Sequence, residues 1–291
     1  NPLPGSERNR FVMACASDDL DEVYRLLKAD EDPDQMDVDG MAGIHVAMES
    51  RNLELLELLT HFGADPYLHI GNKKKNLNVM ELGIEEGFID GLRFLDEERG
   101  VKLAPRGDQK LDNLLFRAFD RPDNILTLRW LIEEKMLDPA EAVDSEGIDL
   151  LTESERSNSM LTYTEYLLQA GMDPNDEAPP PREKSMAEID IYDSETPRRE
   201  SYSSLPLVRA SYNAEPDLAD LYLEYKADPL KWDRNNNTAW DALSDRLNRN
   251  LEKYKTEVWY LREVIKAAAD RVYAGLKPPN PPLLGFVNPS P

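Results

Sequence analysis

The sequence predicts an all-α fold that is built from short helices in a repeating unit of about 34 residues. Two observations carry this prediction. An Asp-Pro pair closes an apolar stretch five times, at 32–33, 65–66, 138–139, 173–174 and 228–229, and Ala104-Pro105 is a weaker counterpart. The prolines of these pairs are separated by 33, 39, 34, 35 and 55 residues, which is one regular period with a single long interruption.

Short amphipathic helices are expected before these pairs. In residues 52–59, 125–131 and 165–168 the apolar side chains recur at intervals of three and four, which places them on one face of a helix. Gly63 and Gly171 follow the last apolar turn, where helices commonly end in a left-handed residue. The proline that comes two or three residues later prevents the helix from resuming.

A turn is expected after the Asp-Pro pairs, at a constant interval. Gly43 lies ten residues after Pro33, and Ala239 lies ten residues after Pro229. Each is preceded by a turn sequence, which holds Gly40 in one case and Asn236 in the other. Glycine adopts a positive φ at little cost and asparagine tolerates one, so both positions suit tight turns.

At these residues the chain resembles the ankyrin repeat family. That family's signature is a β-turn finger, a Thr-Pro-Leu-His-x-Ala helix start, and a second helix that ends in Gly-Ala-Asp-Pro. Residues 63–66 match the closing tetrad fully, and residues 171–174 and 226–229 match it closely. The opening tetrad corresponds to residues 42–45, 205–208 and 238–241. The resemblance implies an all-α ankyrin-repeat solenoid of stacked helix-turn-helix units with β-turn fingers.

The resemblance divides residues 1–276 into seven repeats, at about 8–36, 37–70, 71–105, 106–141, 142–176, 200–231 and 232–276. Repeats three and four depart most from the pattern. Residues 78–81 replace the opening tetrad in repeat three, and repeat four shows only a helical pattern around Leu114, Leu115, Ala118 and Ile125. Stacked repeats share one continuous core, so we expect the acidic first repeat to cap one end and the apolar helix from Val258 to Leu276 to seal the other.

Two segments lie outside the repeats. Residues 177–199 contain three consecutive prolines and many charged and Ser residues, and we expect them to form a mobile loop at the finger edge. The tail, residues 277–291, holds six prolines around an apolar island at 283–287. Such a tail is expected either to dock on a partner or to fold back along the solenoid.

The composition excludes several functions. The chain has 291 residues, a formal net charge of −23 and one cysteine. The excess of acidic residues argues against direct nucleic-acid binding and favours basic partners. A lone cysteine forms neither an internal disulfide nor a Cys-based zinc site. Because the sequence shows no membrane span or signal peptide, we expect no membrane insertion and a soluble protein of the cytoplasm or nucleus. It does not begin with Met, so we expect a processed or trimmed chain. If the N-terminus is processed, the expected compartment is an organelle.

Candidate chemistry is sparse. The three histidines, His45, His61 and His69, fall in or beside repeat two, where the resemblance assigns His45 a hydrogen bond to the backbone between repeats. Residues 37–40 approach a calcium loop, but the twelfth position, which needs a bidentate Glu, is Val46. Cys15 lies on an apolar helix face and is expected to be a buried thiol. We therefore expect no catalysis, no cofactor and no metal.

The charge distribution is uneven along the chain. Residues 18–39 hold ten acidic and two basic residues, whereas residues 252–277 hold six basic and four acidic ones. The acidic stretch is either a solvated surface or a cleft that attracts a basic helix or tail of a partner.

The resemblance implies a non-catalytic protein–protein interaction module, either an adaptor or an architectural subunit of a larger assembly. Family members bind through finger tips and inner helices, which here correspond to Asp37, Asp39, Met41, Tyr67, His69, Lys73, Asp144, Glu146, Trp232, Asp233 and Arg234. The expected partner is a protein with a basic segment. Two alternatives remain open, namely a chaperone for a basic client protein and the recognition domain of a longer enzyme or effector.

Overall fold

The structure is a computed structural model, which describes residues 10–70, 77–103, 111–119, 121, 124–144, 147–156, 160–179, 204–248 and 255–275. The chain divides into two compact bodies. We call residues 1–142 the N-terminal body and residues 143–291 the C-terminal body, and we describe each by itself.

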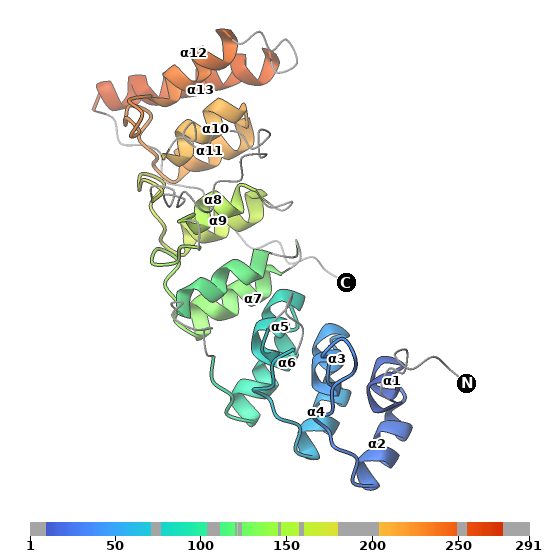
Figure 1. Cartoon of the computed structure of the whole chain (residues 1–291). Coiled ribbons are helices and arrows are strands. Elements are labelled where there is room, and N and C mark those ends of the chain that lie inside the picture. The colour runs from blue at the N-terminus through green and yellow to red at the C-terminus, as the bar shows by residue number, and fades with distance from the viewer. Residues whose placement is uncertain are drawn as a thin grey trace, which may run out of the picture. The chain divides into compact units, whose positions relative to one another are not determined.

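The N-terminal body is a stack of helix pairs (Figure 1). Its first helices, α1, α3 and α5, contact one another in order along the stack. The bounds of its helices are α1 Arg10–Ala16, α2 Leu20–Lys28, α3 Gly43–Glu49, α4 Leu53–His61, α5 Val79–Glu86, α6 Ile89–Arg93 and α7 Ile125–Arg129. The π-helical segments η1 Phe94–Glu98 and η3 Trp130–Glu134 extend α6 and α7, and η2 Leu111–Phe119 is a 3₁₀ helix.

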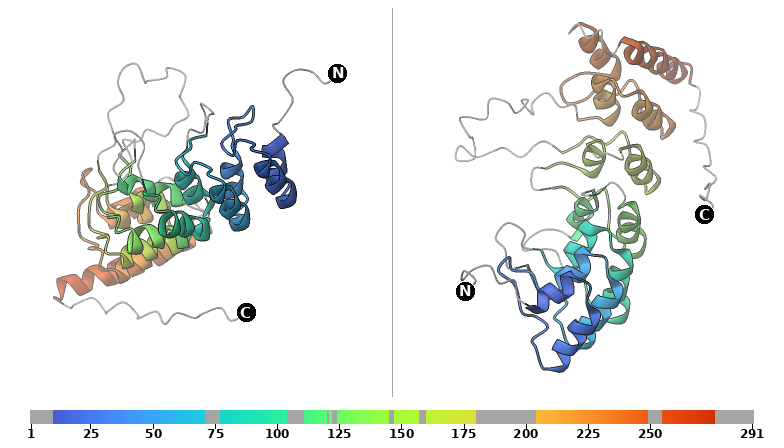
Figure 2. Two further views of the ribbon diagram at one scale, coloured as in Figure 1. Left: turned by 90° about the horizontal axis from the view of Figure 1, so that it is seen from below. Right: turned by 90° about the vertical axis from the view of Figure 1, so that its right-hand side faces the viewer.

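The C-terminal body continues the same pattern of pairs (Figure 2). Its helices are α8 Leu150–Ser154, α9 Met160–Gln169, α10 Pro206–Asn213, α11 Pro216–Glu224, α12 Ala239–Asn248 and α13 Lys255–Tyr273. Helix α10 packs on α12, and α11 packs on both α9 and α13. In the described residues the only β-type pairing is three isolated antiparallel bridges, Met36 with Ala42, His69 with Asn78, and Val143 with Asp149.

The Asp-Pro pairs shape the turns that follow the second helices. In all five pairs a carboxylate oxygen of the aspartate accepts a hydrogen bond from the backbone N–H two residues later, at 2.8–3.0 Å. This is an Asx turn, which mimics a backbone turn. The residue after the proline then links repeats, because Asp34 accepts from the Asp65 N–H at 2.8 Å and Asn175 accepts from the Asp228 N–H at 2.6 Å.

The second helices end at a residue with positive φ. The prediction for Gly63 and Gly171 is confirmed, with φ of 93° and 105°, and Gly100 and Gly275 occupy corresponding positions. Three repeats place a residue with a side chain there, namely Asp30, Met136 and Lys226. A left-handed conformation costs an L-residue about 1–2 kcal/mol, so these positions carry local strain.

Replacing Met136 by Gly should raise the free energy of unfolding by about 1 kcal/mol, because it removes the penalty of the 57° φ. Little packing is lost, since Met136 is 81% exposed. Urea denaturation followed by circular dichroism measures the change. The matched control is Gly63→Ala, whose Cβ would contact nothing, so it should destabilise by a similar amount through conformation alone. Equal stability of all three proteins would contradict this account.

The core is apolar and follows the predicted pattern. In repeat one Phe11, Ala14, Val23, Leu26 and Leu27 are buried. Cys15 is buried with them, as expected, and packs in the core. Burial raises the pKa of its thiol to about 12, so the thiol stays protonated and unreactive. In repeat four Leu114, Leu115 and Ala118 are buried as expected, but on a 3₁₀ helix.

A buried ion pair joins repeats five and six. The Arg209 guanidinium donates two hydrogen bonds to Glu155, from Nε to Oε2 at 2.7 Å and from Nη2 to Oε1 at 2.8 Å, and both side chains are under 10% exposed. Arg209 also donates to the Ser204 carbonyl, and the Tyr222 hydroxyl donates to Glu155 at 2.5 Å. Burial by itself would lower the pKa of Arg209, but the charge of Glu155 raises it overall.

The last helix, α13, buries one face and exposes the other. Val258, Leu261 and Ile265 are buried against the preceding helices, whereas Trp259 is 51% and Val272 45% exposed. A terminal helix has neighbours on one side only, so some of its apolar side chains stay exposed. Leu276 lies outside the described residues.

The inserted segment leaves and rejoins the stack at adjacent points. The Ala178 N–H donates to the Ser204 carbonyl at 2.8 Å, and the Arg234 guanidinium donates to the Ala178 carbonyl. The predicted mobile loop spans residues 177–199; residues 177–179 are described and make these contacts through Ala178, whereas residues 180–199 lie outside the described residues, as does the tail, residues 277–291.

A six-residue Gly-Ser linker in place of residues 180–203 should raise the free energy of unfolding by about 1 kcal/mol, because loop closure costs about 0.6 kcal/mol per doubling of length. The hydrogen bond between Ala178 and Ser204 shows that a short linker spans the gap. Thermal and urea denaturation of the two proteins test this. A loss of more than about 1 kcal/mol would instead mean that the segment packs on the stack.

Candidate protein-interaction surface

The fingers are built on an aspartate at a fixed position. Asp37, Asp144 and Asp233 each donate their backbone N–H to the carbonyl four residues later, at 2.9 Å. The carboxylate of each accepts the N–H of that same residue, which is Met41, Ile148 or Asn237, at 2.8–2.9 Å. Gly40, Gly147 and Asn236, three residues after the aspartate, have positive φ of 77°, 81° and 59°. One side chain thus closes each finger. In the first and last of these three fingers the residues that follow the aspartate, Val38 with Asp39 and Arg234 with Asn235, are exposed.

A buried histidine joins repeat two to the next finger. His45 is fully buried, and its Nδ1 accepts the Ala42 N–H at 3.0 Å. Nε2 therefore carries the ring hydrogen and donates to the Leu68 carbonyl, 3.1 Å away. Burial lowers the pKa of His45, which keeps the imidazole neutral. The hydrogen bond from His45 to the backbone is therefore present, but Leu68 lies within residues 37–70, so the bond joins two parts of repeat two.

The structure is similar to ankyrin repeat domains. It matches the crystal structure of the human ASB11 ankyrin repeat domain with a TM-score of 0.56 and 13% sequence identity, over 81% of this chain and 91% of that one. It matches the ankyrin repeat domain of Bcl-3 with a TM-score of 0.55 and 20% identity, over 80% of this chain and 93% of that one. The chain has the ankyrin-repeat fold. The sequence by itself matches no protein-family model and no curated protein.

The first ankyrin finger presents an apolar tip between acidic residues. Val38 is 66% exposed and lies between Asp37 and Asp39, and Met36 is 38% exposed. The Asp37 carboxylate accepts two backbone N–H groups of the turn, whereas Asp39 is exposed. Of the residues expected here as partner contacts, Asp39 is the most accessible, while Asp37 and Met41 are partly buried.

The second ankyrin finger exposes an aromatic side chain. Tyr67 is 52% exposed, as expected, and its hydroxyl lies 3.5 Å from the Lys102 backbone nitrogen. His69 is also exposed at the bridge with Asn78. Lys73 lies outside the described residues.

The fingers of the C-terminal body differ in what they expose. Trp232 is 61% exposed, as expected for a contact residue. Asp233 is only 4% exposed because its carboxylate closes the finger, and the Arg234 guanidinium is held by the Ala178 carbonyl and by Glu177 at 3.8 Å. Asp144 is partly buried in its turn, and Glu146 lies outside the described residues. Both residues lie on the last finger, where Asp233 is buried and Arg234 is exposed.

The acidic stretch of the first ankyrin repeats keeps most of its charge. Among its carboxylates, Glu22 forms ion pairs with Arg10 and Arg25, each at 2.7 Å. The hydrogen bond from Arg25 is the main cause that lowers the pKa of Glu22 to about 2. The Lys28 ammonium lies over the rings of Tyr24 and Phe62, 5.4 Å from each. Since backbone N–H donors cap Asp19, Asp32 and Asp37 without neutralising them, the segment stays strongly negative.

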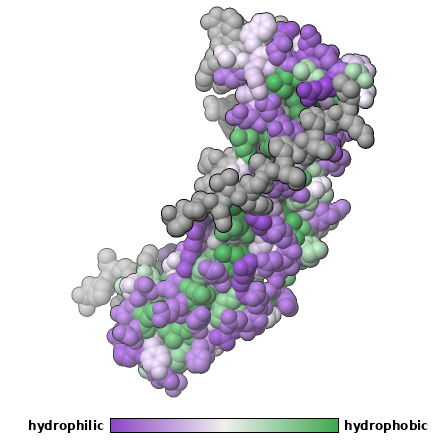
Figure 3. Space-filling view, turned by 180° about the vertical axis from the view of Figure 1, so that it is seen from behind, coloured by the Kyte–Doolittle hydropathy of each residue, from purple (hydrophilic) through white to green (hydrophobic). Residues whose placement is uncertain are grey.

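The described residues show no metal-binding arrangement. They contain no group of three or more His, Cys, Asp or Glu side chains that could hold a metal ion. His61 and His69 are exposed, and the His61 ring packs edge-on against Phe62. No helix in this part of the chain is long and apolar enough to cross a membrane. The face shown in Figure 3 is mainly hydrophilic with smaller hydrophobic areas.

Proposed function

We propose that the chain is a non-catalytic protein–protein interaction module, an adaptor or subunit of a larger assembly, that binds a basic segment of a partner protein. The observation that carries the proposal is the first finger, where exposed Val38 lies between two aspartates in a segment of ten acidic and two basic residues. An apolar contact inside a negative field suits a partner segment that alternates Lys or Arg with apolar residues.

The electrostatics favour fast and salt-sensitive association. Only one of the acidic residues between 18 and 39, Glu22, pairs with a basic side chain in the described part of the chain. Opposite charges on a partner would therefore meet carboxylates that are solvated rather than already paired. Such complementarity raises association rates mainly at low salt, because a Debye length of about 8 Å screens it at physiological ionic strength.

The exposed aromatic residues provide further contacts. Tyr67 on the second finger and Trp232 on the last are each more than half exposed, and aromatic residues dominate binding hot spots. Asp39 on the first finger and His69 on the second finger are exposed as well. Together with the exposed Arg234, these four are the partner contacts that we propose, whereas the carboxylate of Asp233 is buried in its turn.

Neutralising exposed acidic side chains tests the proposal. The triple variant Asp30→Asn, Glu31→Gln, Asp39→Asn removes three exposed charges without touching the aspartates that close the turns. The control variant Glu97→Gln, Glu98→Gln, Glu224→Gln removes three exposed charges elsewhere. Each protein is immobilised and used to capture partners from an extract of its source at low and high salt, with quantitative mass spectrometry of the retained proteins.

We expect the wild type and the control variant to retain the same basic protein, and the triple variant to retain about tenfold less of it at low salt. The difference should shrink as salt rises. Retention of the same proteins in the same amounts by all three would show that the acidic segment only keeps the chain soluble.

A further inference from the structure

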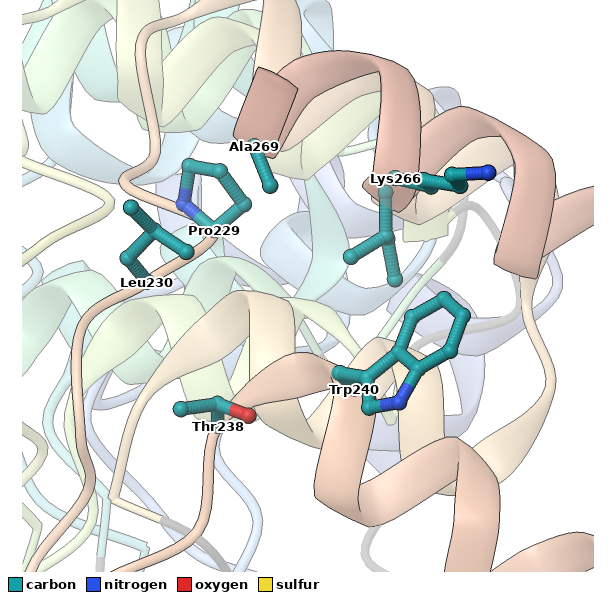
Figure 4. A pocket seen from close by; sticks show the side chains of 7 residues that line it. Pro229, Leu230, Thr238, Trp240, Lys266 and Ala269 are labelled. Carbon is teal, nitrogen blue, oxygen red and sulfur yellow. The ribbon is translucent and has the colours of Figure 1, made fainter. Parts of the chain in front are cut away.

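The last repeat contains an apolar pocket of about 310 Å³, which is at the small end of binding-site volumes. Figure 4 shows its walls, which come from the turn after α11, the start of α12, and α13. The lining residues are Pro229, Leu230, Thr238, Trp240, Ile265, Lys266 and Ala269. The pocket is large enough for one bulky apolar side chain.

Two basic groups lie beside the pocket. The Arg262 guanidinium is 4.9 Å from the Trp240 ring centroid and 5.1 Å from that of Trp259, so the two indoles hold it in place. Lys266, one turn further along α13, lines the pocket itself and is exposed. Stacking on aromatic rings uses the faces of a guanidinium and leaves its N–H donors available at the edge.

Two acidic groups near the pocket have hydrogen-bond partners of their own, whereas Glu263 and Asp270 on α13 are exposed. Asp241 accepts both the N–H and the hydroxyl of Thr238, at 2.9 and 2.7 Å, and thereby caps α12. Asp220 accepts the Tyr260 hydroxyl at 2.6 Å. Among the residues that the structure describes, neither Arg262 nor Lys266 forms an ion pair, in a chain with 23 excess negative charges.

We infer that this pocket is a docking site for a partner segment with one bulky apolar side chain and a carboxylate one or two residues away. The apolar side chain fills the space between Trp240 and Ile265, and the carboxylate binds Arg262 and Lys266. Trp and Arg are the residue types that most often dominate binding energy when they line a pocket. This ligand chemistry is opposite in charge to the basic segment proposed for the N-terminal body, so the two sites would take different segments.

Selection from a random-peptide phage library on the immobilised full chain identifies the preferred ligand directly, whichever protein supplies it. Enriched peptides should carry a Leu, Ile, Phe or Trp close to an Asp or Glu. One such peptide, made synthetically with a fluorophore, is then titrated with the wild type and with variants by fluorescence polarisation.

We expect Arg262→Glu and Trp240→Ala to weaken binding of this peptide at least tenfold. Tyr273→Ala is the matched control, because it removes a 78% exposed aromatic side chain of α13 that lies outside the pocket, and it should leave binding unchanged. Arg262→Glu changes a partly exposed side chain, so it keeps the test valid if Trp240→Ala unfolds the repeat. Replacing the peptide carboxylate by Lys should restore binding to Arg262→Glu.

Three results would overturn the inference. One is a set of enriched peptides without an acidic residue, and another is equal binding by all variants. The third is peptide binding only after the chain is truncated behind Gly275, which would mean that the tail occupies the pocket. The triple charge variant of residues 30, 31 and 39 should bind the peptide normally, so failure of the proposed function is distinguishable from failure here.

Discussion

Replacing Arg209 by Met should lower the free energy of unfolding of the C-terminal body by about 3–5 kcal/mol. The substitution leaves Glu155 buried without its partner, and an uncompensated buried charge is among the most destabilising changes known. Tyr222 still donates to Glu155 in the variant, but this one hydroxyl does not make up for the two charge-assisted hydrogen bonds that are lost. Urea denaturation, with hydrogen exchange of residues 147–230 to locate the loss, measures the effect.

Two further variants separate charge from packing. Arg156→Met removes a 59% exposed guanidinium whose ion pair with Glu153 lies on the surface, and it should change stability by less than about 1 kcal/mol. The double variant Arg209→Met, Glu155→Leu removes both buried charges and should recover much of the loss. If the double variant is no more stable than Arg209→Met, the ion pair is not the source of the effect.

Replacing His45 by Ala should cost about 2–4 kcal/mol in the N-terminal body. The change leaves the Ala42 N–H and the Leu68 carbonyl without their partner in a buried site, and it opens a cavity. The exposed His61 is the matched control, and His61→Ala should change stability by about 0.5 kcal/mol or less. Equal effects of the two substitutions would contradict a bridging role for His45.

The difference between wild type and His45→Ala should also depend on pH. Burial lowers the pKa of His45 in the folded state, so below pH 6.5 the unfolded chain binds a proton that the folded chain does not. The contribution of His45 is therefore complete above pH 6.5 and falls as the pH drops, by up to about 1.4 kcal/mol per unit. Denaturation of both proteins at pH 7.5 and pH 5.5 checks the sign.

Sequence reasoning predicted the turns because their chemistry is local. The Asp-Pro pairs, Gly63 and Gly171 act on backbone groups within a few residues of themselves, so spacing along the chain was enough to locate them. The fingers carried a signal that was missed. An aspartate three residues before Gly40, Gly147 and Asn236 repeats in the sequence and predicts which carboxylates close the turn.

Contacts between distant segments were beyond such reasoning. Glu155 and Arg209 are 54 residues apart, and the pocket in the last repeat combines three segments between Pro229 and Ala269. Nothing in the local pattern says which residues meet there. Arg209 did offer a hint, because it stands among apolar residues at 205–210 that are buried together, and a charged residue in such a run needs a partner.

The Asx turns bear on how this chain folds. Each forms from hydrogen bonds within three residues, and each is followed by helices whose contacts are mostly with the adjacent pair. Such short-range contacts give a low relative contact order, which favours faster folding than in a chain of equal length with pairings between distant segments. Because five repeats carry their own Asx turn, nucleation can begin in any of these and propagate to its neighbours. A destabilised repeat would then slow propagation across itself while the repeats on either side still form.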